Sequence, residues 1–239
     1  NHMIIMPDAD MDQAADALVG AGFGAAGERC MAISVAVPVG EGTAEALRER
    51  LVPKIEALKV GPYTAGNDVD FGPVVTAAAK ANILRLVETG VAQGADLVVD
   101  GRDFKLQGYE DGFFVGAHLF DHVTPEMDIY KTEIFGPVLT SIPFSTEEEA
   151  LEMANDTEYG LTGYVWTNDL TRALRFTDRL EAGMIWVNSE NVRHLPTPFG
   201  GVKASGIGRD GGDWSFEFYM EQKHIGFALG QHNIPRLGA

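Results

Sequence analysis

The chain has 239 residues, of which 45% are hydrophobic and 22% charged, a composition typical of a globular enzyme with a sizeable core. Its 18 basic and 35 acidic residues give a net charge of −17, which excludes partners that need a basic surface, such as nucleic acids and anionic membranes. No apolar run approaches the roughly 18 residues of a membrane span. The single cysteine cannot form an internal disulfide, so we expect a cytoplasmic protein. The chain opens with Asn-His-Met, which we expect of a piece of a longer protein.

In chain order, the first predicted element is a helix that starts at Asp8 or Asp10 and ends near residues 24–27. The apolar segment 31–39 is rich in β-formers and predicts a strand covered on both faces. The amphipathic segment 43–60 predicts a helix with a kink or break at Pro53. Another helix should begin after Thr76 and end at Gly90 or Gly94, and residues 95–101 should form a short strand.

The second half alternates in the same way, with strands expected at 112–120, 136–144, 161–167 and 183–188. Helices are expected at 145–156, capped by Ser145 or Thr146, and at 170–180. Strands alternating with helices predict an α/β fold, a largely parallel sheet with helices on both faces. The irregular stretch 195–212 is typical of a functional loop. Residues 215–230 predict an exposed strand, which must be covered or paired with another chain.

Cys30 lies in the segment FGAAGERCMA, residues 23–32. The small residues before it leave room for a substrate atom, and the Arg29 cation favours a thiolate or an anionic substrate. The start of a strand also aims backbone N–H groups at one point, as an oxyanion hole requires. On the residues alone, a buried structural cysteine is the commoner alternative, and the spacing does not decide between the two.

Three motifs carry a resemblance that covers essentially the whole chain: FGAAGERCMA, GYEDGFFVGAHLFDHV at 108–123 and EIFGPV at 133–138. Their order and separation are similar to those of the aldehyde dehydrogenase superfamily. The first two thirds resemble CoA-acylating methylmalonate-semialdehyde dehydrogenases. From residue 159 onward the chain is instead similar to the carboxymethyl-hydroxymuconate-semialdehyde and betaine-type branch, so it is expected to be a mosaic of two branches.

The resemblance implies the following roles. Cys30 would add to an aldehyde carbonyl to give a thiohemiacetal, lose a hydride to NAD, and pass the resulting thioester to water or to CoA. Arg29 would bind the carboxylate of a semialdehyde. Glu133 would bind the ribose hydroxyls on the nicotinamide side of NAD, and Phe135 would contact the nicotinamide ring.

The aldehyde entrance would be lined by residues 191–199, including Phe199. Arg193 or His194 could supply a second carboxylate contact, although a solvated loop charge is the simpler interpretation. The pattern GIGRDG at 206–211 fits GxGxxG, but no strand precedes it and no βαβ unit follows, so we interpret it as a structural loop. His118 and His122 have no third ligand nearby, and no metal site is expected.

Residues 1–215 are therefore expected to form the catalytic thiol domain, and residues 216–239 an oligomerisation strand and tail. The NAD-binding Rossmann domain of the family would lie upstream and be absent from this chain. The tail strand implies a homo-oligomer, a dimer or higher. Two alternatives remain open: a cofactor-independent thiol hydrolase that acts on activated esters through Cys30, and a non-catalytic oligomerisation module.

Overall fold

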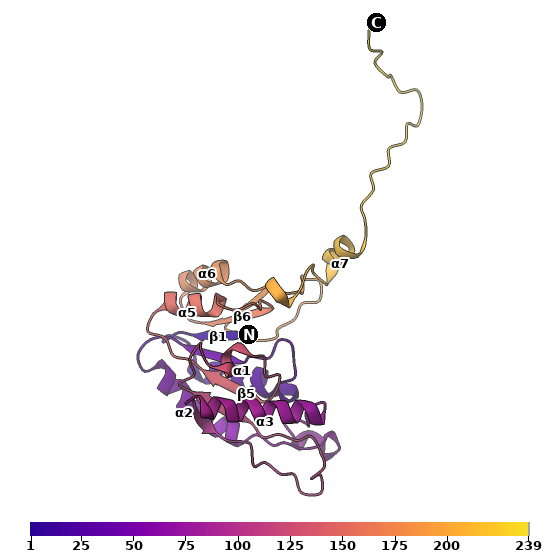
Figure 1. Cartoon of the computed structure of the whole chain (residues 1–239). Coiled ribbons are helices and arrows are strands. Elements are labelled where there is room, and N and C mark those ends of the chain that lie inside the picture. The colour runs from indigo at the N-terminus through magenta and orange to yellow at the C-terminus, as the bar shows by residue number, and fades with distance from the viewer. Residues whose placement is uncertain (239) are drawn as a thin grey trace.

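A computed structural model describes residues 1–238 and shows one seven-stranded sheet in the order β3-β4-β5-β2-β1-β6-β7 (Figure 1). Every neighbouring pair is parallel except β3 and β4, which are antiparallel. The interior strand β1, which pairs with β2 and β6, is apolar and fully buried at three of its four positions. The strands are β1 His2–Ile5, β2 Val35–Pro38, β3 Asp96–Val99, β4 His118–Asp121, β5 Val138–Ser141, β6 Thr162–Trp166 and β7 Met184–Val187.

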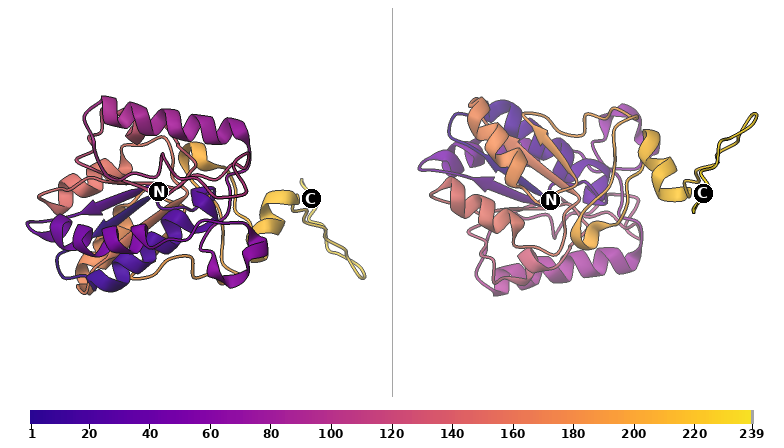
Figure 2. Two further views of the ribbon diagram at one scale, coloured as in Figure 1. Left: turned by 90° about the horizontal axis from the view of Figure 1, so that it is seen from below. Right: turned by 90° about the horizontal axis from the view of Figure 1, so that it is seen from above.

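Helices cover both faces of the sheet (Figure 2). Successive side chains of a strand point to opposite faces, and β4 shows which helix lies on which side. Asp121 pairs with Arg48 of α2 at 3.1 Å, whereas Phe120 lies against α3 at Gly90. The predicted fold class is confirmed. The helices are α1 Met11–Phe23, α2 Thr43–Glu56, α3 Ala77–Ala92, α4 Asp128–Lys131, α5 Glu147–Asn155, α6 Leu170–Arg179 and α7 Gly212–Tyr219.

Side-chain caps fix where several helices begin, as the sequence predicts. The Asp10 carboxylate accepts a hydrogen bond from the Gln13 backbone N–H, and the Thr76 hydroxyl accepts one from Ala79. At the start of α5, Thr146 and Glu149 form a reciprocal capping box. Each cap satisfies a backbone N–H that has no partner inside its helix, which is why the ends can be predicted locally.

Three expectations about elements need correction. Of the kink or break expected at Pro53, the break does not occur, because α2 continues through this residue. The strand expected at 112–120 begins only at His118, because the preceding residues pack as a loop. Residues 215–219, expected in the tail strand, belong to α7. Their alternating pattern suits a strand, but with no neighbouring strand to pair with, the i→i−4 hydrogen bonds of a helix satisfy the backbone instead.

The segment after α7 leaves the body of the molecule as an extended trace (Figure 1). Residues 220–238 form no strand within the described chain. Their apolar side chains are largely exposed, including Ile225, Phe227, Leu229 and Leu237. None of the helices in the described part of the chain has the length and hydropathy needed to cross a lipid bilayer.

Candidate active site

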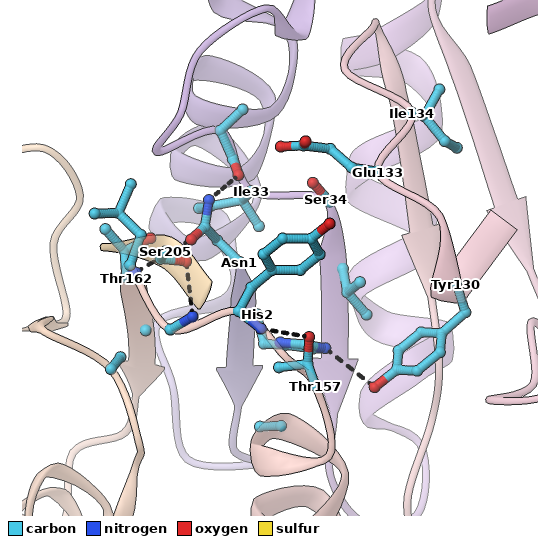
Figure 3. Close-up of a pocket in the computed structure, with 18 of the residues that line it drawn as sticks. Asn1, His2, Ile33, Ser34, Tyr130, Glu133, Ile134, Thr157, Thr162 and Ser205 are labelled. Carbon is cyan, nitrogen blue, oxygen red and sulfur yellow. Dashed lines mark hydrogen bonds between the residues drawn. The ribbon is translucent and has the colours of Figure 1, made fainter. Parts of the chain in front are cut away.

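A cavity of about 640 Å³ lies at the edge of the sheet where the parallel strands begin (Figure 3). Its lining comes from the segments that enter five strands, β1, β2, β5, β6 and β7. Because parallel strands all begin at the same edge, residues far apart in the chain converge there. Open α/β sheets commonly bind ligands at the opposite, carboxyl edge, so this placement is a distinctive property of the fold.

The loop that carries the cysteine leaves α1 through a left-handed turn. Ala25, Ala26 and Gly27 all have positive φ, of 54°, 56° and 71°. For the two alanines this conformation is strained, and such strain persists only where the surroundings enforce it. The turn leads into Arg29 and Cys30, which are both exposed and both line the cavity.

A close backbone contact joins this loop to the segment that precedes β5. A Cβ atom at Gly27 would lie 2.1 Å from the carbonyl oxygen of Gly136, so only glycine allows the two backbones to approach this closely. Gly136 is itself packed against Ile83 of α3. The contact brings Glu133 and Phe135 into the lining of the same cavity as Cys30. Figure 3 shows the Glu133 carboxylate directed toward the side of Asn1 and Ser34, whereas Ile134 points away.

The side chain of Asn1 holds the cysteine loop in place. Its amide nitrogen donates to the carbonyl oxygens of Cys30 and Ala32, at 2.9 and 2.8 Å. Its oxygen accepts from the N–H of Thr162 at 3.2 Å, and Figure 3 labels both of these residues. One side chain thereby ties the loop before β2 to the first residue of β6. The sequence motifs did not reveal this role, because its partners lie about 30 and 160 residues away.

A buried tyrosine and a half-buried one hold fixed hydrogen bonds near the cavity. The Tyr164 hydroxyl donates to the carbonyl oxygen of Met31, the residue after Cys30, at 3.1 Å. Burial raises the pKa of Tyr164 to about 12, so it stays a donor across the physiological range. Burial likewise raises the pKa of Tyr130 to about 12, and its hydroxyl donates to the Met153 carbonyl oxygen at 3.2 Å.

His2 is the histidine that the fold places in the lining of this cavity, and it was not expected there. Its Nε2 atom lies 3.5 Å from the Tyr130 hydroxyl oxygen. Burial lowers the pKa of His2 to about 3, with a smaller contribution from the ammonium group at the N-terminus. The imidazole is therefore neutral near pH 7. Because this pKa lies far below 7, His2 is a poor proton acceptor, and its imidazole serves the cavity as a hydrogen-bonding group rather than as a general base.

The wall that precedes β6, residues 155–161, is held by the 3₁₀ turn Lys203–Ser205. The Lys203 ammonium donates to the carbonyl oxygens of Asn155 and Thr157 and pairs with Glu181, at 2.7, 3.2 and 2.5 Å. The Ser205 hydroxyl accepts from the Gly160 N–H at 2.9 Å. Lys203 adopts a left-handed φ of 53° to make these contacts, so the wall is built around a strained residue.

Arg193, His194 and Phe199 do not line the cavity that contains Cys30. The Arg193 guanidinium lies 4.4 Å from the centroid of the Phe199 ring, a cation–π contact that holds the two together. His194 is exposed, and its carbonyl oxygen accepts from Thr197. Their predicted contacts with substrate stay predictions.

The glycine-rich stretch 206–211 packs loops together. A Cβ atom at Gly208 would lie 2.1 Å from the Phe218 ring, and one at Gly211 would lie 2.6 Å from the carbonyl oxygen of Thr197. These glycines let α7 and the 195–199 loop approach closely, which supports a structural interpretation of the pattern.

Among residues 1–238, no three His, Cys, Asp or Glu side chains converge as a metal site would require. His118 is fully buried in β4, whereas His122 is exposed and pairs with Asp96 at 2.9 Å.

The fold and the cavity define an α/β domain that presents an exposed thiol next to an arginine, with an acid and an aromatic ring across a shared hollow. Comparison with known sequences specifies the class further. The family model described as "Aldehyde dehydrogenase family" matches residues 1–225. The chain belongs to the aldehyde dehydrogenase family.

Individual relatives agree with this assignment. Malonate-semialdehyde dehydrogenase of Pseudomonas aeruginosa is 50% identical over 232 residues, which cover 94% of this chain and 46% of that protein. The mitochondrial acylating methylmalonate-semialdehyde dehydrogenase of Arabidopsis thaliana is 44% identical over 190 residues, or 79% of this chain and 30% of that protein.

Among solved structures, a putative methylmalonate-semialdehyde dehydrogenase of Sinorhizobium meliloti complexed with NAD superposes with a TM-score of 0.90 at 55% identity. The match covers 92% of this chain and 45% of that one. The chain thus spans about half the length of the P. aeruginosa and S. meliloti relatives. Both of these matches extend into the C-terminal third, and the mosaic of two branches stays a prediction.

Proposed function

We propose that this chain is the thiol-bearing catalytic part of an NAD-dependent semialdehyde dehydrogenase, with Cys30 as the nucleophile. The observation that carries the proposal is the exposure of Cys30 and Arg29 in one cavity with Glu133 and Phe135. The names of the semialdehyde dehydrogenase relatives support the same reaction class.

The reaction follows from the chemistry of a thiolate. The Cys30 sulfur forms a bond to the aldehyde carbon, and the carbonyl π electrons move to oxygen to give a thiohemiacetal oxyanion. When the oxyanion re-forms its carbonyl, hydride leaves that carbon and a thioester remains on Cys30. Attack by water or by the thiol of CoA then breaks the C–S bond, releases the acid or the acyl-CoA, and returns the Cys30 thiolate.

Arg29 would select the substrate. Its guanidinium forms no ion pair with any residue that the structure describes, and the residue is exposed beside the thiol. A semialdehyde that places its carboxylate on this cation would bring its carbonyl carbon near the sulfur, which lowers the entropic cost of attack.

The cavity also fits the nicotinamide half of NAD. Glu133 offers carboxylate oxygens to ribose hydroxyls, and Phe135 exposes 42% of its surface, so its ring can pack on a flat heterocycle. NAD, when bound, supplies the hydride acceptor for the aldehyde carbon. Glu133 and Phe135 would orient it, and the Gly27–Gly136 contact fixes their distance from the cysteine loop.

CoA is proposed as an acyl acceptor because two relatives carry the word "acylating" in their names. We also propose a homo-oligomer, supported by the exposed apolar side chains of residues 220–238, which would be covered by a neighbouring copy. The single free cysteine supports a reducing compartment, the cytoplasm.

A second candidate function, a thiol esterase, is favoured by the exposure of Cys30 alone. Attack on an activated ester needs a reachable thiolate and backbone donors but no hydride acceptor.

The two candidates can be separated in one set of assays. The chain and its Cys30→Ala variant are incubated with malonate semialdehyde and NAD, with and without CoA, and in parallel with an aryl ester. NADH formation that requires Cys30 supports the dehydrogenase. Ester turnover that requires Cys30, without any NADH, supports the hydrolase. Ester turnover that Cys30→Ala leaves unchanged would contradict a catalytic Cys30.

A further inference from the structure

A second cavity, of about 320 Å³, lies between α3 and the long connection from β3 to β4, and we call it the loop cavity. Antiparallel neighbours such as β3 and β4 can be joined by two residues, yet residues 100–117 separate them here. Connections of this length in a compact domain usually carry a function. The loop cavity shares no lining residue with the cavity of Cys30.

The connection is held firmly against the body of the domain. The Lys80 ammonium of α3 donates to the carbonyl oxygen of Gly112 at 3.2 Å, and the Val74 N–H donates to that of Phe113 at 3.0 Å. At its base, Gly101 packs against Gly116, where a Cβ atom would lie 2.4 Å from the carbonyl carbon. These contacts fix the loop over the cavity.

Its walls combine apolar surface with cations. Tyr109 and Phe114 pack edge to face, with ring centroids 6.0 Å apart. The apolar lining residues are Leu84, Phe104, Leu106, Tyr109, Phe114 and Val115, and the charged ones are Lys80, Arg102, Lys105 and Glu110. Among the lining side chains three cations face one acid, while Asp100, Asp103 and Asp111 lie in the same loop outside the lining.

Hydrogen bonding shows which of these charges are free. Arg102 forms a bidentate ion pair with Asp100. Glu110 accepts from the Gly108 N–H at 2.9 Å, and this bond lowers the pKa of Glu110.

The two lysines retain donors. Lys80 uses one of its three N–H groups on Gly112, and Lys105 makes no hydrogen bond or ion pair with the residues described. Asp103 and Asp111 are exposed in the same loop but do not line the cavity. Two ammonium groups with spare donors thus lie against an apolar, largely aromatic hollow.

We propose that the loop cavity binds a small organic anion with a flat apolar body, of the class of aromatic carboxylates. The ring packs among Leu84, Phe104 and Phe114, and the carboxylate bonds the ammonium groups of Lys80 and Lys105. The volume is at the lower end of the range of small-molecule sites, which lie at roughly 300–1,000 Å³. A one-ring acid suits this size, and a dinucleotide does not.

The test uses para-fluorobenzoate, with binding to the chain followed by fluorine NMR. Lys105→Gln is expected to weaken binding at least about tenfold, the loss expected for one charge-assisted hydrogen bond. Lys80→Gln should add to the effect, and Leu84→Trp should abolish binding by filling the hollow. Lys54→Gln is the matched control, because Lys54 pairs with Asp16 on the opposite face of the sheet and should leave affinity unchanged.

Two further comparisons make the result decisive. The neutral analogue para-fluorobenzyl alcohol should bind the parent chain and Lys105→Gln equally, and circular dichroism should show that each variant is folded. Absence of saturable binding up to about 10 mM, the weak end of small-ligand affinity, would overturn the proposal. So would binding that Arg29→Leu removes while Leu84→Trp leaves it intact, since the acid would then occupy the cavity of Cys30.

Discussion

Arg29 and Cys30 are consecutive exposed residues, and the local chemistry of the cavity depends on this pair. A cation next to a thiol attracts anionic reagents to the sulfur. The carboxylate of a semialdehyde and a negatively charged alkylating agent should respond to this cation in the same way.

Replacement of Arg29 should therefore reduce the preference of Cys30 for negatively charged over neutral alkylating reagents. Arg29→Leu is expected to slow alkylation of Cys30 by iodoacetate about three- to tenfold, for a charge interaction of roughly 1 kcal/mol near the surface. Alkylation by neutral iodoacetamide should change much less. Arg85→Leu on α3 is the control, and equal slowing of both reagents in Arg29→Leu would exclude electrostatic guidance.

The sequence predicted four of the residues in this cavity, Cys30, Arg29, Glu133 and Phe135, because they belong to short motifs. Asn1, His2 and Lys203 were missed for a physical reason. Asn1 and Lys203 act through hydrogen bonds to backbone atoms distant in the chain, and the environment of His2 comes from its neighbours in the sheet. Such contacts leave no local pattern.

At the level of elements, the cysteine loop and the segment before β5 meet at Gly27 and Gly136. The contact needs both the left-handed φ of Gly27, 71°, and the absence of a Cβ atom. These two requirements can be separated by experiment, because Gly42 has a similar φ of 76° and a Cβ atom added there would have no neighbour within 4 Å.

Gly42→Ala should cost roughly 1 kcal/mol, the strain of a left-handed alanine. Gly27→Ala adds a backbone clash and should reduce the free energy of unfolding in urea by at least about 2 kcal/mol more. Equal losses in the two variants would show that the loops are not in the contact described.

Lys203 should control the order of the wall before β6. Lys203→Met removes the ammonium that bonds Asn155 and Thr157 but keeps a long apolar side chain. Amide hydrogen exchange in residues 156–160 should then accelerate about tenfold, while exchange in β1 stays unchanged. Lys223→Met in the exposed tail is the control. Unchanged amide exchange of residues 156–160 in Lys203→Met would contradict the proposal that Lys203 holds this segment in place.

Elements with local signals were predicted well. The caps at Asp10, Thr76 and Thr146 carry their own partners within three residues. Strand β1 was missed because its four residues are too few to show alternation, and only pairing with β2 and β6 defines it. Residues 215–219 were wrongly predicted as a strand because their polar and apolar residues alternate. Alternation alone does not provide a neighbouring strand to pair with.

At the scale of the whole molecule, a buried titratable group links stability to pH. His118 is fully buried, and neither ring nitrogen has a hydrogen-bond partner in the described chain. Burial lowers the pKa of His118 below its ordinary value of 6.5. Below that pH the unfolded chain binds a proton that the native state does not, so stability decreases as the pH falls.

His118→Leu should weaken the dependence of the free energy of unfolding on pH at acidic pH. The free energy of unfolding, measured in urea between pH 7 and 5, should fall less steeply by up to about 1.4 kcal/mol per pH unit, the limit for one proton. His232→Leu in the exposed tail should leave the slope unchanged. If the free energy of unfolding of His118→Leu falls between pH 7 and 5 as steeply as that of the parent chain, or more steeply, the native imidazole can be protonated.

The proposed chemistry requires Cys30 to be an attacking group within the native fold, and the single cysteine allows a direct measurement. The folded chain is mixed with an aryl ester, quenched, and mapped by peptide mass spectrometry for an acyl group on Cys30. The structure predicts acylation of Cys30 in the native protein, in step with release of the aryl alcohol. Acylation that occurs only after unfolding in urea would contradict it.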